Sequence, residues 1–172
     1  MNRVIWAMVA IYLAIGLAFW SHAAAAAPEL VSFSDARFAP GTIVVSNSEK
    51  RLYLVQRGGT ALRYPVAVGK RGKAWTGRTF IRGMHVRPAW SPPAVVKRDL
   101  PHLPAVIPGG AANNPMGVAA MTLAGGEFAI HGTNRPGSIG RAVSYGCIRM
   151  QNRDIADLFR RVNVRTPVVA VN

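Results

Sequence analysis

The residues with the clearest chemical potential lie between Ile130 and Met150, where the chain carries its single cysteine, Cys147, and a histidine, His131. A cysteine nucleophile needs a base within hydrogen-bonding reach, and the turn residues between these two positions allow the chain to double back. An unperturbed thiol has a pKa of about 8.5, which a neighbouring imidazolium lowers. We therefore predict that Cys147 is a nucleophile, that His131 is its base, and that the thiol titrates below about 7.5.

Backbone groups next to this pair are candidates for holding a reacting carbonyl. Gly146 lets the main chain approach a substrate closely, so the peptide N–H groups of Gly146 and Cys147 are the expected oxyanion hole. A third group should orient the His131 ring, and we predict that the backbone carbonyl of Gly132 does so. Ser144 is expected to be a turn or hydrogen-bonding residue of the same loop.

Length and composition limit the class of protein. The 172 residues suffice for one ordinary domain, and half of them are apolar, so the chain can bury a core. Twenty-one Lys and Arg residues against seven Asp and Glu residues give a net charge of +14, and such a surface attracts polyanions. A single cysteine excludes an intramolecular disulfide framework and a zinc cluster of several thiolates. We expect a small, basic domain without a metal.

The N-terminal residues have the order of a secretory signal. Asn2-Arg3 precedes an apolar run from Val4 to Trp20, and residues 21–27 are small and alanine-rich. We predict a signal peptide over 1–27, with an uncleaved N-terminal membrane anchor as the alternative, and hence an exported protein of the periplasm or cell envelope. Residues 28–40 show no clear period and are interpreted as a linker or leader arm, which leaves 41–172 as the catalytic domain.

The elements that must position the reactive residues are mostly strands. Seven β-rich runs are predicted to form strands: 42–46, 51–55, 62–68, 79–81, 118–123, 127–131 and 168–171. Pro65 argues for an edge or a bulge in the third of them. The proline-rich stretch 87–114 is expected to form long ordered loops. One helix is expected after the cysteine, with Asn152 as its N-cap.

The stretch Ser144-Tyr145-Gly146-Cys147-Ile148-Arg149 resembles the active-site signature of the L,D-transpeptidase catalytic-domain family. In that pattern a strand ending in His-Gly-Thr, here His131-Gly132-Thr133, precedes Ser/Thr-His-Gly-Cys-hydrophobe-Asn/Arg. Tyr145 stands where many members carry a second histidine. A second departure is Ala74-Trp75-Thr76-Gly77, where a Thr-Pro-x-Gly turn is usual. Further similar segments extend the resemblance from about residue 41 to 171: 52–54, 64–69, 76–77, 88–90 and 114–117.

The resemblance implies a fold, a reaction and partners. The fold would be a mixed β-sandwich or barrel-like domain with one short helix after the cysteine loop. Without a cofactor, Cys147 would attack the bond between the diamino acid and the terminal D-Ala of a peptidoglycan stem tetrapeptide, and D-Ala would leave. An acceptor amine of a second stem would then give a 3→3 cross-link. Water would instead give L,D-carboxypeptidase activity, and the lysine of an envelope lipoprotein would give anchoring.

Substrate contacts are expected close to the cysteine. Stem peptides carry several carboxylates, which Arg149, Arg141 or Arg135 would hold in bidentate pairs. Thr133 and Tyr145 complete the set of expected substrate-binding residues.

Three other interpretations use the same residues. A non-catalytic cell-wall-binding module would keep the fold and the charge, but the presence of both His131 and Cys147 argues against it. A nucleic-acid binder is favoured by charge alone, and the sequence lacks a stacking motif or a helix-turn-helix pattern, so we expect no nucleic-acid partner. A zinc hydrolase would have to use His85, His102 and the His131/Cys147 pair, which have no recognisable ligand spacing. Contact with a membrane is expected only if the N-terminal segment stays uncleaved.

Overall fold

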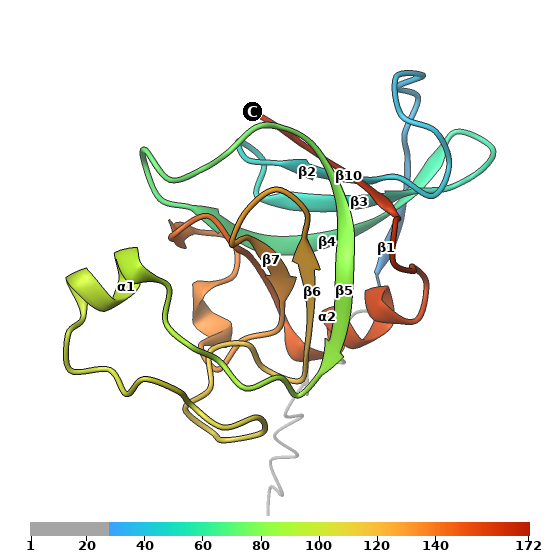
Figure 1. The fold of residues 1–172 in the computed structure, drawn as a ribbon. Helices are drawn as coiled ribbons and strands as arrows, with labels where there is room; N and C mark the ends of the chain where they lie inside the picture. Colours follow the sequence, from blue (N-terminus) through green and yellow to red (C-terminus); the bar gives the residue numbers. More distant parts are fainter. Residues whose placement is uncertain (1–27) are drawn as a thin grey trace, which may run out of the picture.

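The protein is built on a ten-stranded sheet that curls until distant strands meet (Figure 1). The computed structural model describes residues 28–172, so the predicted signal segment 1–27 lies outside the described residues. The strands are β1 (Glu29–Ser32), β2 (Ile43–Ser46), β3 (Arg51–Val55), β4 (Thr60–Gly69), β5 (Gly77–Val86), β6 (Ala119–Leu123), β7 (Ala129–His131), β8 (Ala142–Ser144), β9 (Ile148–Met150) and β10 (Pro167–Val171). Nine of them follow the order β1-β4-β3-β2-β10-β5-β6-β7-β9, and β8 pairs with β4 off this path. Strand β9 also pairs with β4, which closes the sheet. The predicted mainly β, barrel-like fold is confirmed.

Each of the seven predicted strands is present, and β4 and β5 extend to ten residues each. Strands β8 and β9, on either side of the cysteine, have no counterpart among the predicted strands. Each has three residues, too few for an alternating pattern to show in the sequence.

Pro65 sits where β4 changes partners. The Val66 N–H donates to the Lys50 carbonyl, so the nitrogen of Pro65 faces the opposite edge of β4. On that edge, β1 pairs with residues up to Arg63 and β9 begins to pair at Val66. The missing N–H therefore costs no ladder hydrogen bond: Pro65 lies at a locally unpaired edge, one of the two positions predicted for it, and the register of β3 and β4 shows no bulge there.

The main core fills the inside of the curled sheet. Its largest fully buried side chains come from strands on all sides and from the helix at 152–159: Ile43, Leu52, Tyr64, Ile81, Met121, Leu123, Ile130, Ile148, Met150, Ile155 and Leu158. Burying side chains of this size stabilises the fold by roughly 1.5–3 kcal/mol each. This core fixes the strands that flank the cysteine and the histidine.

The segment expected to be a linker is part of the fold. Residues 29–32 form β1, which pairs antiparallel with β4, and Phe38 is buried in a small outer cluster with Val44 and Val169. These residues of the predicted linker or leader arm therefore pack on the domain and do not form a free linker. The sequence did not predict this strand, because Ser32, Ser34 and Pro40 interrupt the apolar residues. A strand of four residues is also too short to show a clear alternation.

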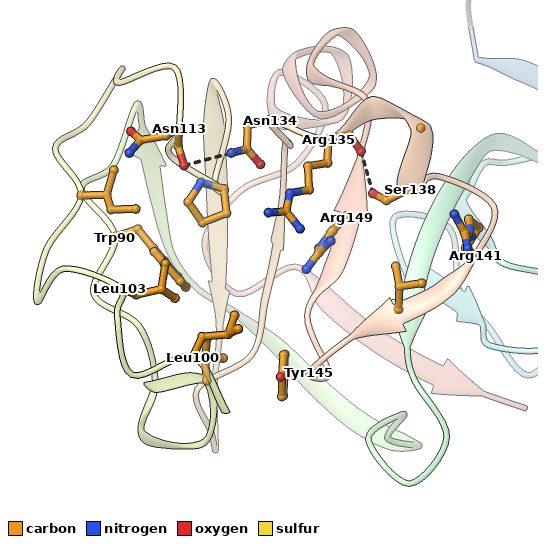
Figure 2. Close-up of a pocket in the computed structure, with 15 residues that line it drawn as sticks. Trp90, Leu100, Leu103, Asn113, Asn134, Arg135, Ser138, Arg141, Tyr145 and Arg149 are labelled. Carbon is orange, nitrogen blue, oxygen red and sulfur yellow. Dashed lines mark hydrogen bonds between the residues drawn. The ribbon is translucent and has the colours of Figure 1, made fainter. Parts of the chain in front are cut away.

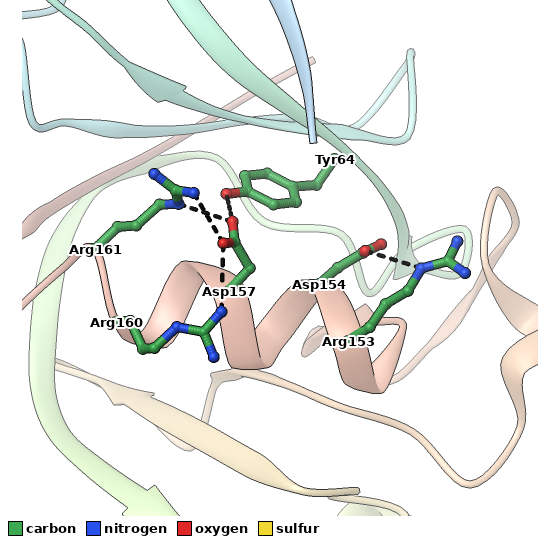
Figure 3. Close-up of polar contacts among 6 residues, drawn as sticks. All are labelled: Tyr64, Arg153, Asp154, Asp157, Arg160 and Arg161. Carbon is green, nitrogen blue, oxygen red and sulfur yellow. Dashed lines mark hydrogen bonds and ion pairs between the residues drawn. The ribbon is translucent and has the colours of Figure 1, made fainter. Parts of the chain in front are cut away.

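Helix α2 (Asn152–Phe159) follows the cysteine loop, as predicted, and packs against β6 and β7. Its N-cap is Gln151 without a side-chain bond, so the predicted capping role of Asn152 is wrong. On its other face, Asp157 accepts a 2.7 Å hydrogen bond from Tyr64 and pairs with Arg161 (Figure 3). This contact ties the helix to β4.

A second helix, α1 (Ala94–Asp99), lies in the proline-rich stretch for which only loops were predicted. It has six residues and follows Pro92-Pro93, so it is too short to show a helical period. We call residues 87–118 the overhanging segment, because it runs from β5 to β6 outside the sheet (Figure 1). Neither helix of residues 28–172 is long and apolar enough to cross a membrane.

Candidate active site

Strand pairing brings the cysteine and the histidine to one cavity. β7 and β9 lie parallel, with His131 opposite Arg149 in the register. Side chains two residues apart in an extended chain share a face, so Cys147, just before β9, lies on the same side as Arg149. Cys147, His131 and Arg149 together line a cavity of about 110 Å³, to which the overhanging segment contributes Trp90 and Val96.

His131 is buried and held in one tautomer. Its Nδ1 lies 2.7 Å from the carbonyl oxygen of Gly132, the contact predicted from the sequence. A carbonyl oxygen only accepts hydrogen bonds, so Nδ1 carries the proton and Nε2 of the neutral ring is unprotonated. Burial lowers the pKa of His131 to about 4, and the positive charge of Arg149 acts in the same direction. The backbone carbonyls of Gly132 and Pro115 raise this pKa, but by less. The ring is therefore a neutral base at pH 7.

The thiol of Cys147 is also neutral in this arrangement. Burial raises its pKa above the ordinary value, although the Ala129 backbone and the Arg149 charge act in the opposite direction. This direction is opposite to the low thiol pKa predicted from the sequence, because burial dominates and the neutral His131 ring supplies no positive charge. The thiol faces the Glu127 carbonyl, with Sγ 3.9 Å from that oxygen, and no hydrogen bond joins it to His131 among the described residues. Catalytic contacts of this kind often tighten only when substrate is bound.

Ser144 organises the loop that carries the nucleophile. Its Oγ accepts a 3.0 Å hydrogen bond from the Gly146 N–H and donates a 2.6 Å hydrogen bond to the Cys147 carbonyl. The Gly146 N–H is thereby occupied, so the expectation that it belongs to an oxyanion hole is not met. The Cys147 N–H donates to no acceptor in the described part of the chain and is the remaining candidate.

Gly146 is required for a different reason from the one predicted. Its φ of 122° lies in the region that glycine favours, and a Cβ added there would stand 2.4 Å from Cε1 of Phe128. The close approach at Gly146 is thus made by an aromatic ring of the protein. Trp75 stacks on that ring and donates its indole N–H to the Gly146 carbonyl at 3.0 Å.

A larger cavity of about 520 Å³ adjoins the first and shares Arg149 and Tyr145 with it. Arg135 and Arg149 point into it, and residues of the overhanging segment form its other side (Figure 2). Arg141 also lines it, while no Asp or Glu does. Within residues 28–172, none of these three arginines pairs with a carboxylate. The cavity therefore offers unpaired guanidinium groups to an anionic ligand.

Tyr145 contacts the overhanging segment. Its hydroxyl donates a 2.8 Å hydrogen bond to Asp99 at the end of α1, and the Nζ atom of Lys70 lies 4.0 Å from the centre of its ring. The same contact is the main cause that lowers the pKa of Asp99. Sequence reasoning missed Asp99 and Lys70, which come from distant parts of the chain.

Thr133 does not reach either cavity. It is buried, its N–H donates to Oδ1 of Asn152 at 3.0 Å, and its Oγ1 accepts a 2.9 Å hydrogen bond from the Arg135 N–H. Thr133 was expected to bind substrate, but it lines neither cavity and instead holds the backbone of Arg135. Asn152, predicted as a helix cap, instead braces the turn after β7 and accepts the Val118 N–H as well.

The residues of the zinc alternative do not assemble. In the part of the chain that the structure describes, no three His, Cys, Asp or Glu side chains come together. His85 lies on β5 and His102 in the overhanging segment, and neither lines either cavity.

Fold and site together define a closed β-sheet domain in which one cysteine and one histidine share a cavity next to an arginine-rich one. Residues 40–169 match the YkuD family, the L,D-transpeptidase catalytic domain. The chain belongs to this family of L,D-transpeptidase catalytic domains.

Relatives and solved structures agree with that assignment. The chain is 39% identical over 135 residues to the probable L,D-transpeptidase YbiS of Escherichia coli K12, covering 73% of this chain and 43% of that protein. It is 37% identical over 140 residues to the probable L,D-transpeptidase YcfS of the same organism, covering 76% and 43%. The chain thus spans less than half the length of these relatives.

The fold is shared with solved L,D-transpeptidases. A structure from Enterococcus faecium has a TM-score of 0.61 at 16% identity and covers 78% of this chain and 50% of its own. One from Mycobacterium smegmatis has a TM-score of 0.58 at 18% identity, with coverages of 76% and 58%.

Proposed function

We propose that this protein is a peptidoglycan L,D-transpeptidase in which Cys147 is the nucleophile and His131 the general base and acid. The observation that supports this best is the tautomer of His131. Because Nδ1–H donates a hydrogen bond to the Gly132 carbonyl, Nε2 has the lone pair that can accept a proton in the cavity that also holds the thiol.

In the first step the sulfur of Cys147 attacks the carbonyl carbon between the diamino acid and D-Ala of a stem tetrapeptide. A rotation about χ1 turns the thiol from the Glu127 carbonyl towards His131, whose Nε2 takes the thiol proton as the S–C bond forms. The carbonyl oxygen becomes an oxyanion next to the Cys147 N–H. When the C–N bond breaks, His131 returns the proton to the leaving amine, and a thioester remains.

In the second step an acceptor amine attacks the thioester. Its proton passes to His131 and then to the sulfur as the C–S bond breaks, which regenerates the neutral pair. The diamino acid side chain of a second stem as acceptor gives a 3→3 cross-link. Water gives L,D-carboxypeptidase output, and a lipoprotein lysine gives anchoring.

The arginine-rich cavity suits the carboxylates of the stem peptides. Arg149 lies between the two cavities, so it can hold a substrate carboxylate while the reacting carbonyl faces Cys147. Arg135 and Arg141 offer a second charge-assisted contact further along the same substrate. Reaction with peptidoglycan also requires export, so we place the protein in the periplasm or cell envelope.

The test is incubation of the purified full chain with a disaccharide-tetrapeptide, followed by intact-mass and product mass spectrometry. We expect an adduct on Cys147 equal to the substrate minus D-Ala, free D-Ala, and a cross-linked dimer. Cys147→Ala abolishes the adduct, and His131→Ala slows its formation by about 100-fold or more. Tyr53→Phe, which loses the exposed hydrogen bond to Glu49 and lines neither cavity, serves as the control.

The outcomes separate the candidate activities. A thioester that resolves only to the tripeptide identifies the hydrolytic alternative. An adduct that persists on Cys147→Ala, or no adduct on the wild-type protein, contradicts the proposal.

A further inference from the structure

We propose that Trp75 is a positioning residue for acyl transfer, which fixes the Gly146–Cys147 peptide so that the Cys147 N–H serves as the oxyanion donor. This inference rests on the proposed function, because it assigns a role within the acylation step. Trp75 lines neither cavity, so it acts on the reaction through the peptide and without touching substrate.

The argument starts from the geometry of one peptide unit. The indole Nε1 of Trp75 donates a 3.0 Å hydrogen bond to the Gly146 carbonyl. In a trans peptide the carbonyl and the following N–H point in opposite directions across one rigid plane, and residues 28–172 contain no cis peptide. A bond that fixes the Gly146 carbonyl therefore also fixes the direction of the Cys147 N–H.

The neighbouring backbone groups of the loop are already used. The Ser144 hydroxyl accepts a hydrogen bond from the Gly146 N–H and donates one to the Cys147 carbonyl. The Trp75 indole donates to the Gly146 carbonyl. The Cys147 N–H itself has no acceptor among the described residues. Of the two side chains that hydrogen-bond to the backbone of this loop, Trp75 alone comes from outside it.

Packing holds the indole in place, and a hydrogen bond holds the backbone of the same residue. It stacks on Phe128 with ring centres 5.6 Å apart and planes within 5° of parallel. Phe128 in turn packs against Gly146, and the Trp75 carbonyl accepts a 2.9 Å hydrogen bond from the Asn47 side chain. The ring is packed against the main core as well. A donor fixed in this way keeps the peptide in place as charge develops on the substrate oxygen.

The test compares two reactions of the same thiol. Imipenem acylates a thiol through an oxyanion, with formation of an S–C bond and opening of the β-lactam C–N bond, whose nitrogen takes the proton. Iodoacetamide alkylates the thiol by displacement of iodide and forms no oxyanion. Trp75→Phe keeps a ring against Phe128 but removes the N–H donor, so we expect acylation to slow by about 10- to 100-fold while alkylation stays within about twofold. With the tetrapeptide, kcat falls and KM changes little.

A matched control separates this effect from loss of stability. Tyr64→Phe likewise removes one hydrogen bond from an aromatic side chain, the 2.7 Å bond to Asp157 of α2, but this side chain makes no bond to the nucleophile loop. We expect both reaction rates to be unchanged in Tyr64→Phe at temperatures where it is folded. A second variant carries 3-benzothienylalanine at position 75, which keeps the shape of the indole and replaces its N–H by sulfur. It should reproduce the loss even if the Phe variant folds poorly.

Failure of the inference is distinguishable from failure of the proposed function. No adduct of imipenem or of the tetrapeptide on the wild-type protein contradicts the proposed function. A wild-type protein that is acylated, with either Trp75 variant acylated at the same rate, overturns the inference alone. A parallel fall of acylation and alkylation also overturns it, because Trp75 would then affect the thiol or the fold in general.

Discussion

Tyr145 and Asp99 join the nucleophile loop to the overhanging segment through a 2.8 Å hydrogen bond between a phenol and a carboxylate. Tyr145 lies two residues before Cys147, and Asp99 is the last residue of helix α1. Val96 of the same helix lines both cavities. Lys70 supports the pair, since its ammonium lies over the Tyr145 ring and 3.9 Å from the Asp99 carboxylate. The contact thus connects one wall of the site to the loop that carries the thiol.

Tyr145→Phe should loosen that wall. The ring stays over Lys70, but the hydroxyl that holds Asp99 is lost, so α1 opens more often. We expect amide hydrogen exchange in residues 94–103 to become severalfold faster, while exchange in the core strands is unchanged. Asp99→Asn should show the same pattern, because an amide oxygen is a weaker acceptor than a carboxylate. Unchanged exchange in both variants would show that α1 is held by its apolar contacts alone.

The pH dependence of acylation should be set by His131. The ring must be neutral to accept the thiol proton, and its pKa is lowered to about 4, so the rate should rise as pH passes 4 and then stay level to neutral pH. Iodoacetamide alkylation of the free protein should instead increase only at alkaline pH, because burial raises the pKa of Cys147. Arg149→Gln removes a charge that lowers the His131 pKa, so the acid limb should move to higher pH. The sequence-based alternative, alkylation that levels off below about pH 7.5, would contradict this structure.

Gly146→Ala should disable the loop even though it adds a single methyl group. A left-handed φ costs a non-glycine residue about 1–2 kcal/mol, and the new Cβ would also overlap Phe128. We expect the free energy of unfolding to fall by about 2–4 kcal/mol and acylation to be lost. Adding Phe128→Ala should relieve the overlap but not the φ strain, so the double variant should recover part of its acylation relative to Gly146→Ala. A fully active single variant would show that the loop can take another backbone conformation.

The sequence predicted the parts of the site that are close together in the chain. The contact between His131 and Gly132 joins adjacent residues, and the signature around Cys147 occupies six consecutive positions. Strands with regular alternation, such as β3 and β4, were predicted for the same reason, because the pattern lies within the element itself.

Contacts between distant residues could not be predicted in this way. The bond from Trp75 to Gly146 spans 71 positions, and that from Tyr145 to Asp99 spans 46. Trp75 and Tyr145 both stand where the sequence departs from the usual family pattern. Those departures were the only signals in the sequence that these two residues have a special role. The protonation of the pair was missed because it depends on burial, which makes both His131 and Cys147 neutral.

Two carboxylates of α2 should respond to substitution in opposite directions (Figure 3). Asp154 is buried, its Oδ2 has no hydrogen-bond partner within the described structure, and burial raises its pKa. Asp157 is held by Arg161 and Tyr64, and these contacts lower its pKa. One carboxylate is therefore destabilised by its charge in the folded protein, and the other is stabilised by it.

Asp154→Asn should therefore raise the melting temperature at pH 7, and Asp157→Asn should lower it. The sign follows from linkage: stability contributed by Asp157 is present above its unfolded pKa and lost as pH falls, whereas Asp154 costs stability as pH rises through its raised folded pKa. Asp154→Asn should converge towards the wild-type melting temperature near pH 3, where that carboxyl binds a proton in both states, whereas Asp157→Asn should converge only at still lower pH, because the folded-state pKa of Asp157 is lowered. Calorimetry from pH 3 to pH 7 measures this directly. A fall in melting temperature for Asp154→Asn at pH 7 would mean that its ion pair with Arg153, at 3.3 Å, outweighs the cost of burial.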